Sequence, residues 1–171
     1  MVLARAVGSH PARTLLRLVP LPVTTAWTAP DQPAPRSGDD DAGDDERLRV
    51  LIIEDHDDTR ELYAWCMAAA GWHVEAAADG GEALLLAPTF DPDVIVVDLQ
   101  LPVVGGVQVM KAVRSNARLR QVPMVACTAH RHILTEKEAR AVGFDALVKK
   151  PCDPEALRKT VERLAGSLAG S

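Results

Sequence analysis

The sequence has few aromatic residues and no basic cluster. Two phenylalanines, one tyrosine and three tryptophans make up 4% of the 171 residues, and the net charge at pH 7 is −5. Proteins that bind single-stranded nucleic acid stack bases on aromatic side chains, and nucleic-acid-binding domains in general carry a basic patch. Nucleic acid is therefore not expected as a direct partner.

Cysteine and long apolar runs are also scarce. The three cysteines, Cys66, Cys127 and Cys152, form no CxxC pair and leave an odd number, which disfavours a disulfide framework. No apolar stretch approaches the roughly 18 residues that are needed to cross a membrane. These absences favour a cytoplasmic protein with reduced thiols and no direct membrane partner.

The first part of the chain, residues 1–47, differs in composition from the rest. Prolines recur between Pro20 and Pro35, and an acidic run occupies residues 39–46. Such segments bury too little apolar surface to offset the entropy of ordering, so we expect a disordered extension. A secretory signal is disfavoured because Arg17 and two prolines interrupt its apolar section. An organellar transit peptide and a misassigned start codon both stay open.

From residue 48 onward the hydrophobic pattern becomes regular. Five short apolar runs, each typical of a buried strand, alternate with five helical patterns. Strands that alternate with helices form a parallel sheet with helices on both faces, which predicts one α/β domain at 48–167 and a short tail at 168–171. The expected strands span residues 49–53, 72–77, 93–98, 123–127 and 144–148.

Capping signals place the helices between these strands. Asp58 and Glu61 fit a capping box at the start of the first helix, and Thr135 and Glu138 fit another before the fourth. The second helix is expected to stop before Pro88, since proline disrupts a helix interior. Helical spacing predicts the inward face of the first helix as Leu62, Trp65, Cys66 and Ala69.

Polar residues follow four of the five predicted strands. Because parallel strands all point the same way, their carboxyl ends meet at one edge of the sheet, where open α/β folds bind their ligands. These residues are Glu54 and Asp55 after the first strand, Asp98 at the third, Thr128 at the fourth and Lys150 at the fifth. Each alone has an ordinary explanation, such as a helix cap or a solvated charge. Their joint occurrence at four strand ends predicts a site.

The residue types in this set suit one kind of chemistry. Three carboxylates at one edge repel each other unless a cation lies among them, and a hard ion with oxygen ligands, Mg²⁺ above all, fits such a group. A threonine hydroxyl and a lysine ammonium add a hydrogen-bond donor and a positive charge. Together they suit a phosphoryl group, whose transfer depends on positioning and charge neutralisation. His56, beside Asp55, is interpreted as an ordinary loop residue.

Four segments carry a resemblance to a known family. They are VLIIED at 50–55, VVDLQLP at 96–102, VACTA at 125–129 and VKKP at 148–151. In these motifs and their order, residues 48–167 resemble the receiver domain of two-component response regulators of the chemotaxis-regulator type. The resemblance implies a flavodoxin-like (βα)5 fold, with a five-stranded parallel sheet in the order 2-1-3-4-5.

The resemblance also implies a set of metal ligands. Asp98 would be the phosphoacceptor and would form an acyl phosphate. Asp55, Asp98 and the main-chain carbonyl of Gln100 would ligate Mg²⁺, and Glu54 would act through a metal-bound water.

Further roles follow from the same resemblance. Thr128 would hydrogen-bond the phosphoryl group, Lys150 would ion-pair with it, and the Lys150–Pro151 peptide would be cis. The phosphodonor would be a histidine kinase or a phosphotransfer protein. The signal would leave through the surface of the fourth helix, fifth strand and fifth helix. Beyond its own phosphorylation and dephosphorylation, no enzymatic activity is expected.

One departure from the family pattern bears on output. Leu147 occupies a position where the family often has an aromatic or histidine switch residue, and leucine has no polar ring to rotate. A receiver-fold interaction module that no longer switches is therefore the alternative. A small metal-dependent phosphohydrolase is a third hypothesis, disfavoured because the chain has no length for a cap or a substrate pocket.

Overall fold

The central feature of the protein is a five-stranded parallel sheet, seen in a computed structural model that describes residues 47–129 and 134–168. Its strands lie in the order β2-β1-β3-β4-β5, which confirms the predicted fold. The strands are β1 Arg49–Ile53, β2 His73–Ala77, β3 Val94–Asp98, β4 Met124–Thr128 and β5 Ala146–Lys149. The helices are α1 Asp57–Ala69, α2 Gly80–Phe90, α3 Gly106–Ser115, α4 Glu136–Val142 and α5 Pro154–Leu168.

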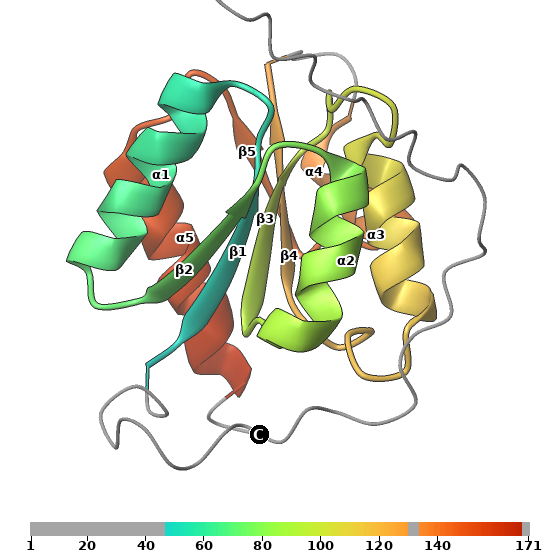
Figure 1. Cartoon of the computed structure of the whole chain (residues 1–171). Coiled ribbons are helices and arrows are strands. Elements are labelled where there is room, and N and C mark those ends of the chain that lie inside the picture. The colour runs from blue at the N-terminus through green and yellow to red at the C-terminus, as the bar shows by residue number, and fades with distance from the viewer. Residues whose placement is uncertain (1–46, 130–133, 169–171) are drawn as a thin grey trace, which may run out of the picture.

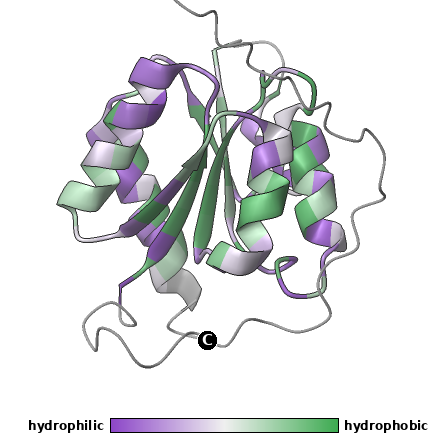
Figure 2. Cartoon of the chain, in the orientation of Figure 1, coloured by the Kyte–Doolittle hydropathy of each residue, from purple (hydrophilic) through white to green (hydrophobic). Residues whose placement is uncertain are grey.

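The helices form two layers around the sheet. Figure 1 shows α1 and α5 on one face and α2, α3 and α4 on the other. The buried side chains form two clusters accordingly: one joins the sheet to α1 and α5, and the other joins it to α2, α3 and α4. Strand β3 is buried along its whole length, and the hydrophobic colouring in Figure 2 is concentrated in the central strands. This burial explains why their sequences are continuous apolar runs rather than alternating ones.

The strand order places the ends of β1 and β3 side by side. After β1 the chain crosses to β2 on one side, and after β2 it crosses to β3 on the other side of β1. Ile53 pairs with Val97 across these two strands, so the next residues, Glu54 and Asp98, leave the sheet at the same level. This is the switch point of the sheet, where helices diverge and leave room for a ligand.

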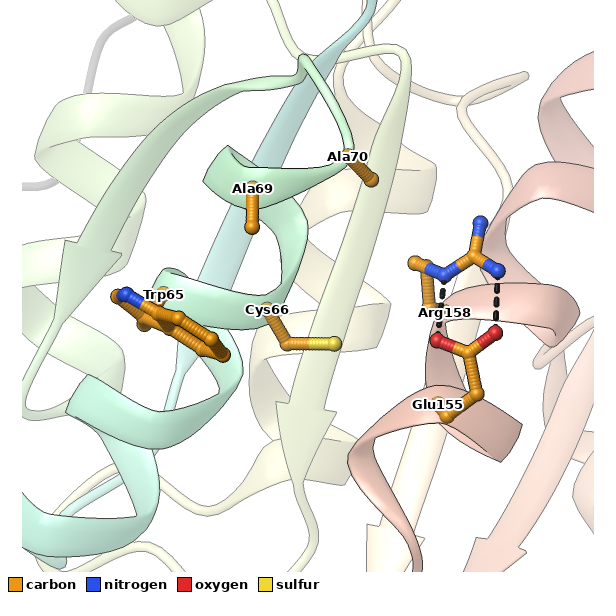
Figure 3. A pocket seen from close by; sticks show the side chains of 6 residues that line it. All are labelled: Trp65, Cys66, Ala69, Ala70, Glu155 and Arg158. Atoms are coloured by element: carbon orange, nitrogen blue, oxygen red, sulfur yellow. Dashed lines mark hydrogen bonds and ion pairs between the residues drawn. The ribbon is translucent and has the colours of Figure 1, made fainter.

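Helix α1 is rotated relative to the sequence prediction, and the predicted inward face was wrong. Tyr63 and Met67 are buried, whereas Leu62 is 48% exposed and Trp65 is 71% exposed. Figure 3 shows Trp65 and Cys66 beside a hollow between α1 and α5, across from Arg158. The helix is apolar on several sides, so its period alone could not select the face that packs on the sheet.

The start of α1 also differs from the prediction. The helix begins at Asp57, with His56 at the N-cap position and no side-chain cap. The backbone N–H of Arg60 already bonds to the carbonyl of His56. The predicted capping box of Asp58 and Glu61 therefore lies inside the helix rather than at its start.

Helix α2 passes through the proline that was predicted to end it. Pro88 is buried inside the last turn, and the helix continues to Phe90. Proline removes one backbone hydrogen bond, and near the end of a helix few bonds remain to be lost. The helix closes at Asp91, whose φ of 53° is left-handed and whose N–H bonds to the carbonyl of Ala87.

The predicted capping box of α4 is confirmed, and α5 also begins after a side-chain cap. Thr135 accepts from the backbone N–H of Glu138, whose carboxylate accepts from the N–H of Thr135 at 2.7 Å. Asp153 accepts from the N–H of Glu155 before α5. None of the helices in the described ranges is long and apolar enough to cross a membrane.

Candidate functional site

Two carboxylates and one ammonium meet at the carboxyl edge of the sheet. Lys150 donates to Asp98 Oδ2 at 2.5 Å and also to Glu54 Oε2. The side chains of Glu54 and Asp98 are 2% and 6% exposed, and that of Lys150 is 14% exposed. These residues come from the ends of β1, β3 and β5, which lie far apart in the sequence.

The charge on Lys150 is stabilised by this arrangement. Burial by itself would lower the pKa of the ammonium, because desolvation disfavours a charged group. The hydrogen bonds and charges of Asp98 and Glu54 outweigh that effect, so the pKa of Lys150 lies above its ordinary value. Lys150 is consequently a fixed cation between two buried carboxylates.

Both oxygens of Asp98 have partners. Oδ2 accepts from Lys150, and Oδ1 accepts from the backbone N–H of Gln100 at 2.8 Å. The chain then turns and approaches the same strand end again at Gly106, where an added Cβ would lie 2.3 Å from the carbonyl oxygen of Asp98. A glycine is therefore required at the start of α3 for the loop to close against Asp98.

The loop that carries Glu54 and Asp55 is held from α1. The guanidinium of Arg60 donates to the carbonyl of Glu54 at 2.9 Å and to the carboxylate of Asp57 at 2.6 Å. The first of these bonds fixes the backbone at Glu54, directly before Asp55. Asp55 is more open than Glu54, with 29% of its side chain exposed.

The acidic group fits a hard divalent cation. Glu54 Oε1 is buried and has no hydrogen-bond partner, although Glu54 Oε2 is bound to Lys150. A buried carboxylate oxygen without a partner is costly, and a metal ion is one group that can satisfy it. Ligand atoms of Glu54, Asp55 and His56 lie within 4.8 Å of one another. These donors are compatible with Mg²⁺, which takes carboxylate, carbonyl and water oxygens.

Thr128 and the loop after β5 complete this edge. Thr128 is buried at the end of β4, and its carbonyl accepts from the N–H of Lys150 at 2.8 Å. The Lys150–Pro151 peptide is cis, as the resemblance implied. Cys152 follows, and its Sγ lies 2.9 Å from the hydroxyl of Tyr63 on α1. The fifth strand is thus tied to both β4 and α1 where it delivers Lys150.

The comparisons with known proteins agree with this architecture. Residues 50–162 match the model of the response regulator receiver domain. The chain belongs to the response regulator receiver family. Over 117 residues it is 32% identical to the polar-differentiation response regulator DivK of Brucella ovis, covering 68% of this chain and 95% of that protein.

Solved receiver domains have the same fold. The chemotaxis protein CheY4 of Vibrio cholerae superposes with a TM-score of 0.65 at 35% identity, over 69% of this chain and 98% of that one. The receiver domain of the sensor histidine kinase PA1611 of Pseudomonas aeruginosa superposes with a TM-score of 0.64 at 25% identity, over 70% and 98% of the two chains. The latter structure has a magnesium ion coordinated in its active-site cleft.

Two residues of this receiver domain stand out from the sequence-based picture. His56 was interpreted as an ordinary loop residue, yet its Nδ1 lies 3.0 Å from Asp55 Oδ1 and 3.6 Å from Glu54 Oε1. Its position beside Asp55 was the available signal, but the direction of the side chain could not be derived from it. Leu147 is half-buried and packs against the apolar cluster under α2, α3 and α4.

Proposed function

We propose that the domain is a phosphoacceptor switch in which a histidine kinase or a phosphotransfer protein transfers a phosphoryl group to Asp98. The observation that carries this proposal is the buried Asp98 with Lys150 bound to its Oδ2. A carboxylate that only capped a helix or stabilised a turn would not require a lysine partner. A buried carboxylate beside a fixed cation can gain further negative charge, as it would on phosphorylation, because the cation compensates it.

The transfer itself balances as a displacement at phosphorus. A carboxylate oxygen of Asp98 forms the new P–O bond while the P–N bond of the donor phosphohistidine breaks, and the imidazole leaves with the electron pair. Lys150 and Thr128 would then contact phosphoryl oxygens. For Lys150 this means exchanging its present bond to Asp98 for one to the phosphoryl group.

A metal would be held by Asp55, Asp98 and the main-chain carbonyl of Gln100, with Glu54 acting through a bound water. Mg²⁺ supplies positive charge to the phosphoryl oxygens when it is bound. Residues of the chain position the carboxylates. The register of β1 and β3 places Glu54 and Asp98 side by side, and the N–H of Gln100 orients the carboxylate of Asp98. Apart from gaining and losing its own phosphoryl group, the domain is proposed to catalyse no reaction.

Phosphorylation with a small donor tests the proposal directly. The protein is incubated with Mg²⁺ and acetyl phosphate, quenched in acid and weighed by intact-mass spectrometry. The expected result is a gain of one phosphoryl group that is absent from Asp98→Asn and from samples treated with EDTA. A modification that persists in Asp98→Asn would place the acceptor elsewhere and overturn the assignment.

The proposed output surface is formed by α4, β5 and α5, in a domain spanning residues 48–167 that works in the cytoplasm. Lys150 links this surface to the site, because it directly follows β5 and its N–H bonds to the carbonyl of Thr128. Phosphorylation is expected to change amide hydrogen exchange within residues 135–165. This change is to be measured with the acetyl phosphate adduct against Asp98→Asn under the same conditions.

Leu147 favours one alternative, a receiver-fold interaction module that does not switch. Its side chain packs against the core cluster under α2, α3 and α4. A leucine has no hydroxyl or ring nitrogen, so it cannot form a hydrogen bond that responds to a movement of Thr128. If Asp98 is modified while exchange within residues 135–165 stays unchanged, this alternative replaces the switch.

A further inference from the structure

The imidazole of His56 lies at the acidic group, where its Nδ1 and Asp55 Oδ1 form a hydrogen bond at 3.0 Å. His56 occupies the N-cap position of α1, yet its side chain makes no capping hydrogen bond. The side chain is 75% exposed, and its Nδ1 is directed at Asp55 Oδ1 and Glu54 Oε1. The hydrogen bond to Asp55 therefore holds the ring beside two carboxylates, with Nδ1 facing their oxygens.

The distances among these atoms match those around a single ion. Ligand atoms bound at about 2.1 Å to one octahedral ion lie about 3.0 Å apart when adjacent and about 4.2 Å apart when opposite. His56 Nδ1 lies 3.0 Å from Asp55 Oδ1 and 3.6 Å from Glu54 Oε1. An ion among the three atoms would take the place of the hydrogen bond between His56 and Asp55, and all the ligand atoms already lie within 4.8 Å of one another.

The oxygens available to an ion at this edge are limited. Lys150 occupies Glu54 Oε2 and Asp98 Oδ2, and the N–H of Gln100 occupies Asp98 Oδ1. Glu54 Oε1 is buried in a side chain that is 98% buried, and it has no hydrogen-bond partner. A nitrogen donor beside this oxygen would add a ligand to the proposed set of Asp55, Asp98 and the Gln100 carbonyl.

We propose that His56 is a metal ligand in this domain and that the site therefore prefers a divalent transition ion with affinity for nitrogen over Mg²⁺. Mg²⁺ binds oxygen almost exclusively, whereas imidazole suits Zn²⁺, Ni²⁺ and their neighbours in the first transition row. This inference rests on the proposed metal site and adds a ligand and a selectivity to it. His56 thus determines which ion accompanies the phosphoryl group.

Co²⁺ is the probe, because its visible absorption changes when nitrogen replaces oxygen among its ligands. Co²⁺ and Mg²⁺ are titrated separately into untagged full-length protein and into His56→Ala, with calorimetry for affinity and absorption spectra for the Co²⁺ samples. The wild-type protein is expected to bind Co²⁺ at least tenfold more tightly than His56→Ala, a difference of about 1.4 kcal/mol. Mg²⁺ affinity is expected to change by less than about twofold, since oxygen ligands hold that ion.

A matched control removes imidazoles from elsewhere in the chain. The double variant His130→Ala/His132→Ala is expected to retain both the Co²⁺ affinity and the spectrum of the wild-type protein at the tight site. Asp55→Asn is expected to weaken both metals, because it removes a ligand that they share.

The outcomes separate this inference from the proposed function. If Mg²⁺ binds and Asp98 is phosphorylated but His56→Ala leaves Co²⁺ affinity and spectrum unchanged, the role of His56 is refuted and the switch stands. If Asp55→Asn leaves the binding of both metals unchanged, the metal site itself is refuted. Co²⁺ binding that is lost only in His130→Ala/His132→Ala would likewise refute the role of His56.

Discussion

Lys150 holds two buried carboxylates that would otherwise repel each other. Removing one member of a buried charged group leaves the others without compensation, which typically destabilises a protein by about 3–5 kcal/mol. Glu54 and Asp98 would be left in that condition, since Lys150 bonds to both.

We therefore expect Lys150→Ala to lower the free energy of unfolding by about 3 kcal/mol without a divalent metal. Millimolar Mg²⁺ should restore part of the loss, because a cation can neutralise the same carboxylates. Urea unfolding with and without Mg²⁺ measures both effects. Lys149→Ala is the matched control, since Lys149 is exposed at the preceding position; equal losses in the two variants would contradict the assigned role of Lys150.

Gly106 is set by a close approach of two backbone segments. A Cβ there would lie 2.3 Å from the carbonyl oxygen of Asp98, a main-chain atom that cannot rotate away. Gly106→Ala is expected to cost about 1–3 kcal/mol through overpacking and to slow phosphorylation by acetyl phosphate. Gly166→Ala is the control, because no atom lies within 4 Å of an added Cβ there. In this helix the change should be neutral or stabilising by up to about 1 kcal/mol, and unaffected phosphorylation in Gly106→Ala would argue against the contact.

At the scale of elements, the observed orientation of α1 predicts mutational effects opposite to those expected from its sequence pattern. Met67 is fully buried against the sheet, whereas Trp65 is 71% exposed. Met67→Ala should lower the free energy of unfolding by about 2–5 kcal/mol through a core cavity. Trp65→Ala should change it by no more than about 0.5 kcal/mol. The reverse order in chemical denaturation would support the inward face that the sequence predicted.

The cap of α4 gives that element a pH dependence. The hydrogen bond from the backbone of Thr135, followed by that from its side chain, holds the pKa of Glu138 below its ordinary value. A lowered pKa in the folded state means that the stabilisation is fully present above the unfolded pKa, near pH 4.3, and is lost as the pH falls through the folded pKa.

Glu138→Gln should therefore loosen α4 at neutral pH and have no effect below the folded pKa of Glu138. Amide exchange of α4, measured at pH 7 and by pulse labelling after exposure to low pH, detects the change. Glu136→Gln removes the same charge from the same turn without touching the cap. An effect of equal size in both variants would indicate a general charge effect rather than the cap.

At the scale of the whole molecule, a metal that binds only the folded state stabilises every element at once. At one hundred times its dissociation constant, the gain is about 2.7 kcal/mol. Thermal unfolding with increasing Mg²⁺ should show this rise, and Asp55→Asn should lose most of it. Asp57→Asn is the control, because Asp57 is exposed and pairs with Arg60; the same loss in both variants would indicate nonspecific screening.

The parts that could be predicted from the sequence are those in which one signal dominates. The strand ends follow from apolar runs such as Val94–Asp98, and the parallel order brings their polar residues to one edge. The face of α1 could not be derived, because apolar residues lie on several of its sides. The prediction that α2 ends before Pro88 was wrong, because the free-energy cost of a proline in a helix depends on how near it lies to the helix end. The position of His56 beside the carboxylates depends on a side-chain direction that no sequence period encodes.

The bond between Lys150 and Glu54 joins residues 96 positions apart. No amino-terminal fragment of the domain can make it before β5 has been synthesised and added at the edge of the sheet. Under the proposed function, the capacity to accept a phosphoryl group therefore depends on the strand that is synthesised last. A nascent chain, or a truncated chain without β5, would then not be phosphorylated, and only chains that contain the complete sheet would carry the proposed signal.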